Sequence, residues 1–192
     1  MCIRDRGFED ALTASFGENV TFDFQNAQGD SATCATITNG FVSAGVDLIM
    51  ANATQAVISS ATATSDIPIV GTSVTDYVTT GTVKSNDAPG GNVTGTSDLA
   101  PIDQQVELLQ KLVPDAKNVG ILYCSAEANS QYQVDTVKDA LEKLGYTCTY
   151  YAFSDSNDLS SVATTAATES DVIYVPTDNT VASNTEIINN IC

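Results

Sequence analysis

The stretch Asp171-Val-Ile-Tyr-Val-Pro-Thr-Asp-Asn-Thr-Val-Ala-Ser183 has the form of a buried strand that runs into a helix. It begins with a continuous apolar run, which is typical of a strand buried on both faces. Pro176 ends the run because it has no N–H to donate to a neighbouring strand. Asp178, Asn179 and Thr180 follow, and each can accept hydrogen bonds from the first N–H groups of a helix. Parallel α/β sheets bind ligands at such strand ends, so the stretch predicts a binding site.

Short apolar runs alternate with helical patterns through the rest of the chain. We predict strands at 19–25, 46–51, 67–71, 93–96, 119–123, 146–153 and 171–175. We predict helices at 7–16, 31–44, 54–63, 102–113, 130–144, 159–168 and 180–191. A strand–helix alternation of this kind indicates parallel sheets with right-handed crossovers. The fold class is therefore predicted to be α/β.

The rhythm is interrupted once, which predicts two lobes. Residues 7–100 form the first predicted lobe, 101–117 a crossover helix and linker, and 118–192 the second lobe. Each lobe has about three predicted strands, fewer than is usual for a doubly wound sheet, so we expect a chain that is truncated at both ends. Residues 1–6 contain both arginines of the protein, and we interpret them as a non-native segment.

Composition limits the function classes. The chain has 192 residues, 43% hydrophobic and 16% charged, which is typical of a globular protein. Its net charge of −17, with only seven basic residues, argues against nucleic acid or an anionic membrane as a partner. No apolar run approaches the roughly 18 residues of a membrane-spanning helix.

Catalytic and metal-binding side chains are scarce. Histidine, the commonest general base and metal ligand, is absent. The five cysteines contain no CxxC pair, so we predict no metal site, no cofactor and no catalytic residue. Cys124 and Cys148 lie in or beside neighbouring predicted strands, and a disulfide between them is left open. A two-cysteine racemase would need a second thiol to match Cys124, but Cys34 falls within a predicted helix.

Two strand-end turns of the first lobe carry candidate ligand-binding residues. In the turn after 46–51, Thr54 is a candidate N-cap, and the N–H groups from Gln55 onward are open to an anion at the positive end of the helix. The turn after 67–71 offers the hydroxyls of Ser73 and Thr75 and the carboxylate of Asp76. Plain helix capping and solvated turns are the structural alternatives.

Two further turns belong to the second lobe. The turn that follows 119–123 contains the candidates Ser125, Glu127, Asn129 and Ser130. Asn129 or Ser130 is predicted to cap the next helix, with Ser125 and Glu127 facing outward. The opening stretch supplies the fourth turn.

The chemistry of the four turns suits a zwitterion. Helix N-termini favour a carboxylate, and Asp76, Glu127 or Asp178 would suit an ammonium group. If the two lobes face one another, these groups converge on one crevice, and an amino acid meets both demands. Three tyrosines near the turns could line an apolar part of the site: Tyr77, Tyr123 and Tyr132.

Five runs also carry a family resemblance. They are FDFQNAQGD (22–30), DIPIVGTSVTD (66–76), PGGNVTGTSDL (89–99), VGILYCSAEANS (119–130) and DVIYVPTDNTVAS (171–183). In this order they resemble the substrate-binding proteins of ABC transporters, in the group associated with aromatic or branched amino acids. The resemblance spans Gly7 to about Ile188 and implies the type I periplasmic-binding-protein fold, with two Rossmann-like lobes and parallel sheets. The family's first strand and its closing segments have no counterpart here.

The resemblance implies a function without catalysis. A protein of this family binds a small solute in the cleft between its lobes and delivers it to an ABC permease in the membrane. It is extracytoplasmic, either periplasmic or lipid-anchored at the outer face of the cell membrane. The ligand-binding role carries over to the four turns described above. The alternatives are a ligand-binding sensory domain of a receptor and a racemase-like enzyme.

Overall fold

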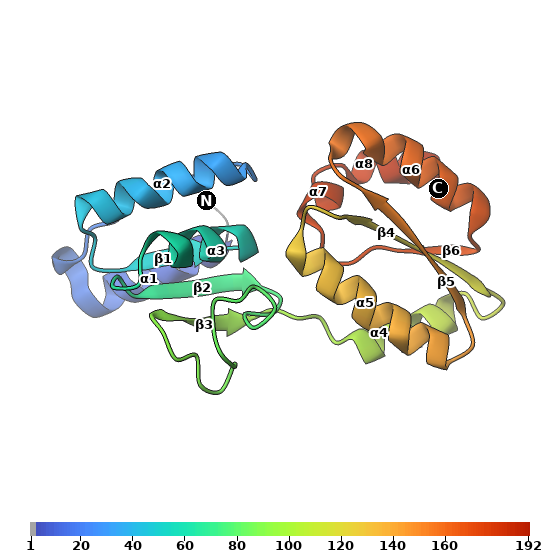
Figure 1. Cartoon of the computed structure of the whole chain (residues 1–192), viewed down its shortest axis with the longest axis horizontal. Coiled ribbons are helices and arrows are strands. Elements are labelled where there is room, and N and C mark those ends of the chain that lie inside the picture. Colours follow the sequence, from blue (N-terminus) through green and yellow to red (C-terminus); the bar gives the residue numbers. More distant parts are fainter. Residues whose placement is uncertain (1–2) are drawn as a thin grey trace. The chain divides into compact units, whose positions relative to one another are not determined.

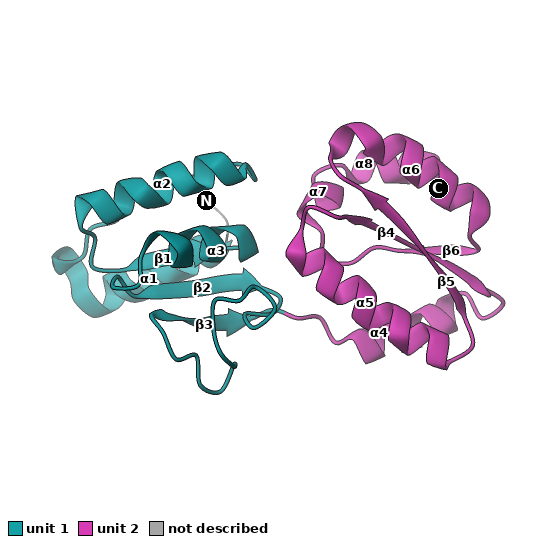
Figure 2. Cartoon of the chain, in the orientation of Figure 1, with its two compact units in different colours: residues 1–98 teal, residues 99–192 magenta. Residues whose placement is uncertain are grey.

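The computed structural model describes residues 3–192, which form two compact units (Figure 2). Unit 1 comprises residues 1–98 and unit 2 comprises residues 99–192. Each unit has a three-stranded parallel sheet of its own, flanked by helices, as Figure 1 shows. The predicted α/β fold with two parallel-sheet lobes is confirmed.

In unit 1 the strands follow the order β1-β2-β3. They are β1 (Ile49–Asn52), β2 (Ile69–Val74) and β3 (Val93–Ser97). The helices are α1 (Ile3–Phe16), α2 (Ser31–Ala44) and α3 (Thr54–Ala63), with a short 3-10 turn, η1 (Gly17–Asn19). Ile49, Ala51 and Ile69 point to one face of the sheet and pack against Val57 of α3, while Met50 and Val70 point to the opposite face, where α1 lies. The two-residue period of the strands produces these two faces.

A close contact between β2 and β3 accommodates the ring of Tyr77. Gly71 pairs with Gly95 across the two strands, and a Cβ at Gly95 would collide with the Tyr77 hydroxyl and with the Gly71 carbonyl. The ring is 5% exposed, and its hydroxyl donates to the Thr96 carbonyl at 3.2 Å. Glycine at both strand positions therefore makes room for a tyrosine in the core of unit 1.

In unit 2 the strands follow the order β5-β4-β6. They are β4 (Asn118–Cys124), β5 (Thr147–Phe153) and β6 (Val172–Tyr174). The helices are α4 (Ile102–Leu112), α5 (Ala128–Lys143), α6 (Ser156–Glu169), α7 (Asn179–Ala182) and α8 (Thr185–Ile191). The central strand β4 is buried from its second residue onward, as the continuous apolar run predicts.

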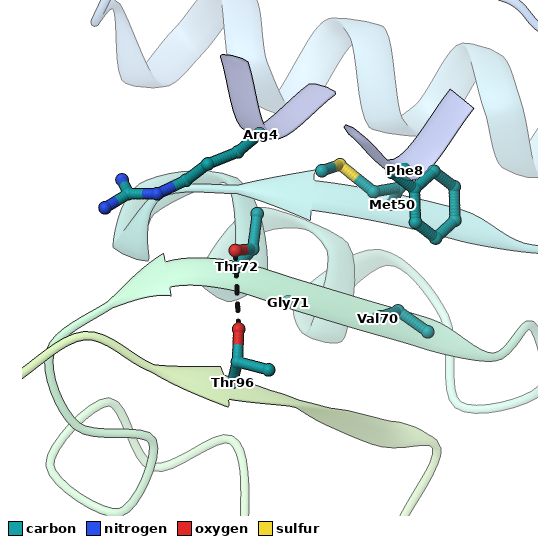
Figure 3. Close-up of a pocket in the computed structure, with 7 residues that line it drawn as sticks. All are labelled: Arg4, Phe8, Met50, Val70, Gly71, Thr72 and Thr96. Atoms are coloured by element: carbon teal, nitrogen blue, oxygen red, sulfur yellow. Dashed lines mark hydrogen bonds between the residues drawn. The ribbon is translucent and has the colours of Figure 1, made fainter. Parts of the chain in front are cut away.

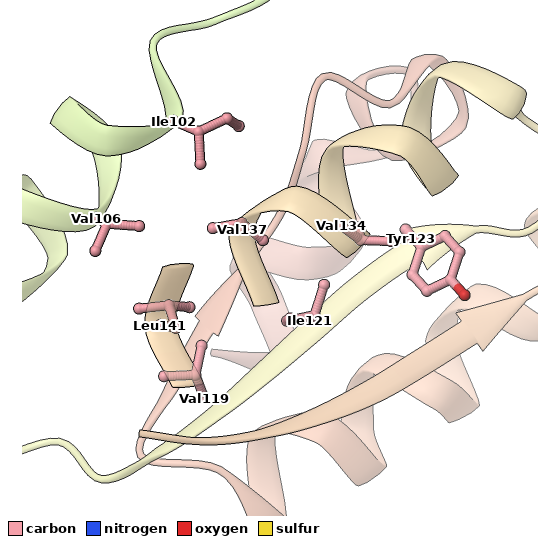
Figure 4. Packing of buried hydrophobic residues seen from close by; sticks show 8 residues of the cluster. All are labelled: Ile102, Val106, Val119, Ile121, Tyr123, Val134, Val137 and Leu141. Atoms are coloured by element: carbon pink, nitrogen blue, oxygen red, sulfur yellow. The ribbon is translucent and has the colours of Figure 1, made fainter. Parts of the chain in front are cut away.

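The sheet of unit 2 has a core on each face. On one face α4 and α5 cover β4, and Figure 4 shows Val106, Val137 and Leu141 beside Val119 and Ile121. On the other face α6 and α8 cover the sheet through a second cluster of side chains: Leu122, Tyr151, Phe153, Leu159, Ala163 and Ile188. Unit 2 is thus a three-layer α/β/α arrangement, with the β4 strand end held between two packed helix layers.

Two predicted elements are wrong. Residues 19–25 alternate polar and apolar side chains but form no strand, because no described strand hydrogen-bonds to them; Phe22 and Phe24 stack on each other at 5.7 Å instead. The single helix predicted at 180–191 is two helices. At the break, the Asn184 side chain donates to the Thr180 carbonyl at 2.8 Å, a local bond that competes with continuation of the helix.

No disulfide joins Cys124 to Cys148. The strand register places Cys148 beside Val119 and Cys124 beside Phe153, so the two thiols lie at different heights of the sheet. Both are free. Cys124 behaves as a small buried side chain, and its Sγ lies 3.5 Å from the Ser154 carbonyl.

Candidate functional site

The predicted site residues lie at the carboxyl ends of the strands, on one edge of each sheet. We define the first rim as residues 52–55 and 72–76 of unit 1, which follow or end β1 and β2. We define the second rim as residues 124–130 and 177–181 of unit 2, which follow or end β4 and β6.

The first rim contains two non-glycine residues in the left-handed region of backbone space. Ala53 has φ 87° and Ser73 has φ 57°. The Ala53 N–H donates to the Thr72 carbonyl at 2.9 Å, which joins the two turns of the rim. Such backbone costs free energy and is concentrated at functional sites. No sequence pattern indicated it, because neither residue type favours a positive φ.

Helix α3 begins at the first rim without a side-chain cap. The prediction that Thr54 is its N-cap is wrong: Ala53 occupies that position and has no side chain able to accept a hydrogen bond. Thr54 is the first helical residue and is 6% exposed, whereas Gln55 is exposed. The first-turn N–H groups of α3 therefore have no capping side chain, which leaves a positive helix end at the strand edge.

The remaining first-rim candidates have partners within unit 1. Ser73 Oγ accepts from Arg4 Nη1 at 2.6 Å, and Thr75 is buried. Asp76 accepts from both the N–H and the hydroxyl of Thr79 at 2.6 Å. Burial raises the pKa of Asp76, but these hydrogen bonds outweigh burial and hold the pKa below its ordinary value. Asp76 therefore remains a carboxylate that is directed at its own loop.

A pocket of about 240 Å³ lies on the face of the unit 1 sheet that α1 covers (Figure 3). Its lining residues are Arg4, Phe8, Met50, Val70, Gly71, Thr72 and Thr96. The hydroxyls of Thr72 and Thr96 lie 3.4 Å apart, and the rest of the lining is mostly apolar. None of the predicted site residues lines this pocket.

In the second rim, the carboxylate of Glu127 links the turn after β4 to the turn after β6. Its Oε1 accepts from the Thr180 N–H at 2.9 Å and from the Thr180 hydroxyl at 2.8 Å. Its Oε2 accepts from the Asn179 N–H at 3.0 Å, the Asn179 side chain at 2.7 Å and the Asn129 side chain at 3.2 Å. Burial raises the pKa of Glu127, but the hydrogen bonds from Asn179, Thr180 and Asn129 prevail and lower the pKa below its ordinary value.

Asp178 joins the same two turns from the buried side. Its Oδ1 accepts from the Val181 N–H at 2.9 Å, so Asp178 is the one of the three candidates Asp178, Asn179 and Thr180 that caps α7. Its Oδ2 accepts from the Cys124 N–H and from the Ser130 hydroxyl, both at 2.7 Å. Asp178 is only 3% exposed. The Asp178 carboxylate thus accepts hydrogen bonds from groups of the protein itself.

Sequence reasoning missed Gln133. Its side chain donates to the carbonyls of Asn129 and Thr177, at 3.1 and 3.3 Å, and its Oε1 accepts from the Thr177 N–H at 3.2 Å. It is 1% exposed. A signal was present: Gln133 stands four residues before the inward-facing Val137, so it is a polar residue on the buried stripe of α5.

The prediction that Asn129 or Ser130 caps α5 is wrong. The helix begins at Ala128 after Glu127, so both residues lie in its first turn. Both are buried, and Asn129 Nδ2 also donates to the Thr177 carbonyl at 3.1 Å. Ser125 is exposed, and its hydroxyl donates to the Phe153 carbonyl at 3.1 Å. The structure brings Glu127, Asn129, Ser130, Asp178, Asn179 and Thr180 into one hydrogen-bonded network.

The tyrosines and cysteines near the rims are mostly core residues. Tyr77 and Tyr123 are each 5% exposed and belong to hydrophobic clusters, while Tyr132 is half-buried. Cys34 lies within α2, as predicted, and its Sγ is 3.9 Å from the Gln55 carbonyl.

Among residues 3–192 no cluster of His, Cys, Asp and Glu has the form of a metal site. Within the same residues, none of the helices has the length and apolarity to cross a membrane.

A parallel α/β fold in two units, with polar rims at the strand ends, is the architecture of the solute-binding proteins. Residues 2–191 match the family described as ABC transporter substrate binding protein, and the chain belongs to this family.

Three proteins illustrate what the chain is similar to. The chain is 41% identical over 189 residues to a tyrosine-binding protein of Clostridioides difficile (strain R20291), covering 98% of this chain and 53% of that protein. It is 39% identical to a Streptococcus pneumonia ABC domain solved in complex with L-Trp, with a TM-score of 0.91 over 97% of this chain and 64% of that one. The leucine-binding protein LivK of Thermotoga maritima shares the fold, with a TM-score of 0.67 at 17% identity, over 88% of this chain and 49% of that one. The chain thus spans about half the length of the curated relative.

Proposed function

We propose that this chain belongs to the extracytoplasmic solute-binding component of an ABC transporter, and that the component binds an amino acid and delivers it to a membrane permease. The observation that carries the proposal is the pair of polar strand-end rims in a chain 39% identical to a structure that holds L-Trp. The tyrosine-binding relative supports an aromatic amino acid as the ligand class. Binding requires no catalytic group, and we assign none.

The first rim suits the ligand carboxylate. The uncapped start of α3 presents backbone N–H groups at the strand edge, beside Thr54 and Gln55. Ser73 and Thr75 add hydroxyls for the ligand carboxylate, whereas the carboxylate of Asp76 suits the ligand ammonium group. We propose these five residues as the ligand-binding set of unit 1.

The second rim contributes through Ser125, Glu127, Asn129, Ser130 and the residues Asp178 to Thr180. Ser125 and Asn179 are the exposed members, and we propose them for direct ligand contact. Glu127 already accepts five hydrogen bonds, and a carboxylate offers about four lone-pair sites. This geometry favours a role in which Glu127 holds other residues in place and does not itself bind the ammonium group. That both rims line one binding cleft is a prediction.

The test is a ligand-dependent unfolding experiment on this chain and on the natural full-length protein. L-Tryptophan and L-tyrosine should raise the unfolding midpoint in a saturable way, because a ligand that binds only the folded state stabilises it by about 2.7 kcal/mol at 100 times its Kd. N-acetyl-L-tryptophan amide, which lacks both charges of the zwitterion, is the matched control and should have no effect. If no amino acid moves the midpoint of the full-length protein, solute binding for transport is the wrong function.

A further inference from the structure

The carboxylate of Glu127 accepts most of its hydrogen bonds from one short segment. Four of its five hydrogen bonds come from Asn179 and Thr180, which donate through both their N–H groups and their side chains, and the fifth comes from Asn129. The two bonded turns lie about fifty residues apart in the sequence, with separations of 52 and 53. Glu127 therefore ties the outer side of the turn after β6 to the turn after β4.

Glu127 is held by hydrogen bonds and not by a cation. The two ion pairs among residues 3–192 are Arg4–Asp98 and Lys138–Glu142, and neither involves Glu127. Hydrogen bonds to a charged group are shorter and stronger than neutral ones and define direction as well as distance. The five donors thus set the geometry of Asn179 and Thr180 more narrowly than a point charge would.

Glu127 and Asp178 hold opposite sides of the turn after β6. Asp178 is 3% exposed and ties the buried side of the turn to β4 and α5 through Cys124 and Ser130. Glu127 is only partly buried and holds the outer side, where Asn179 is exposed. Loss of Asp178 would disturb the core, whereas loss of Glu127 would release the surface layer of the rim with the core bonds in place.

We propose that Glu127 is a positioning residue for ligand binding: its carboxylate clamps the turn after β6 onto the turn after β4 and holds Asn179 and Thr180 in the arrangement that the ligand meets. This inference rests on the proposed function, because it takes the second rim to contact the ligand. It assigns Glu127 a role different from that of an ammonium ligand.

The test compares Glu127→Gln with Glu107→Gln in this chain. Glu107 is exposed on α4, so its substitution removes the same charge away from the rim. Amide hydrogen exchange at Asn179 and Thr180 should accelerate by at least about tenfold in Glu127→Gln, because a local opening then releases these N–H groups. The Val181 amide, which Asp178 holds, should change much less. Unaltered exchange at Asn179 and Thr180 would overturn the clamp.

The second readout is affinity for L-tryptophan and L-tyrosine. Glu127→Gln should weaken binding by about tenfold or more, while Ile121→Val, a mild core substitution, should lower the unfolding midpoint and leave the affinity unchanged. Faster exchange with intact affinity would show that Glu127 serves stability alone and would overturn the positioning role. If no amino acid binds the full-length protein, the proposed function fails, and the hydrogen-exchange result still shows whether Glu127 holds the turn after β6.

Discussion

At the scale of single residues, close packing explains features that residue type does not reveal. Gly95 lies in an exposed edge strand, where a larger residue would be expected, but the Tyr77 ring occupies the space beside it. Ala53 and Ser73 adopt backbone that their side chains disfavour. The residue type at such positions depends on neighbours that are distant in the sequence, so the local sequence does not predict it.

Gly95→Ala tests the contact between β2 and β3. The added Cβ would overlap the Tyr77 hydroxyl and the Gly71 carbonyl, and backbone cannot move as easily as a flexible side chain. We expect a loss of about 1–3 kcal/mol in the free energy of unfolding, measured by urea titration. Gly91→Ala is the control, because a Cβ there meets nothing within 4 Å; it should stay within about 0.5 kcal/mol. Equal effects of the two substitutions would refute the steric account.

At the scale of elements, hydrophobic periodicity was a good guide to helices and strands. Helices α2 and α3 have the predicted limits, 31–44 and 54–63, and every described strand lies within about three residues of a predicted one. The failures have physical causes. A strand exists only if another strand pairs with it, so residues 19–25 could not be judged from their alternation alone.

The candidate site was predictable only in part. The strand-end turns were located correctly because apolar runs end where polar turns begin, and Asp178 caps α7 as one of the three candidates of its turn. The bonds between turns were not predictable, because Glu127 reaches partners more than fifty residues away. A carboxylate that accepts five internal hydrogen bonds and one that awaits a ligand look the same in a sequence.

Helix α5 offers a direct test of the core of unit 2. Leu141 is fully buried between α5, α4 and β4, whereas Leu144 lies one turn further on and is 54% exposed. Leu141→Ala should reduce the free energy of unfolding by about 2–5 kcal/mol, because it removes buried surface and leaves a cavity. Leu144→Ala should change it by less than about 0.5 kcal/mol. Thermal and urea unfolding measure both, and a large effect at Leu144 would contradict the packing of this helix.

At the scale of the whole molecule, each unit has a hydrophobic core of its own. The clusters around β4 lie entirely within unit 2, and the cluster around β1 and β2 lies entirely within unit 1. Domains with separate cores can fold separately. The parallel sheets therefore do not depend on strands exchanged from one unit to the other.

Residues 99–192 should consequently fold when expressed alone. We expect a single cooperative unfolding transition with a near-ultraviolet circular dichroism signal from packed tyrosines, because both core clusters of unit 2 are retained. Leu141→Ala in this fragment should lower the midpoint of the unfolding transition, because Leu141 is buried in the core of unit 2. This control shows that the transition reports unfolding of that core. A broad, non-cooperative melt of the unsubstituted fragment would show that unit 2 needs residues 1–98.

Residues 20–25 belong to no helix or strand. Their backbone donors and acceptors have no ladder partner among the described strands, and the Phe24 ring is 51% exposed. An exposed segment whose backbone groups have no strand partner can pair with a second chain, as an open sheet edge does. We therefore expect concentrated samples of this protein to self-associate through this segment, and a lysine in place of Phe24 should keep them monodisperse.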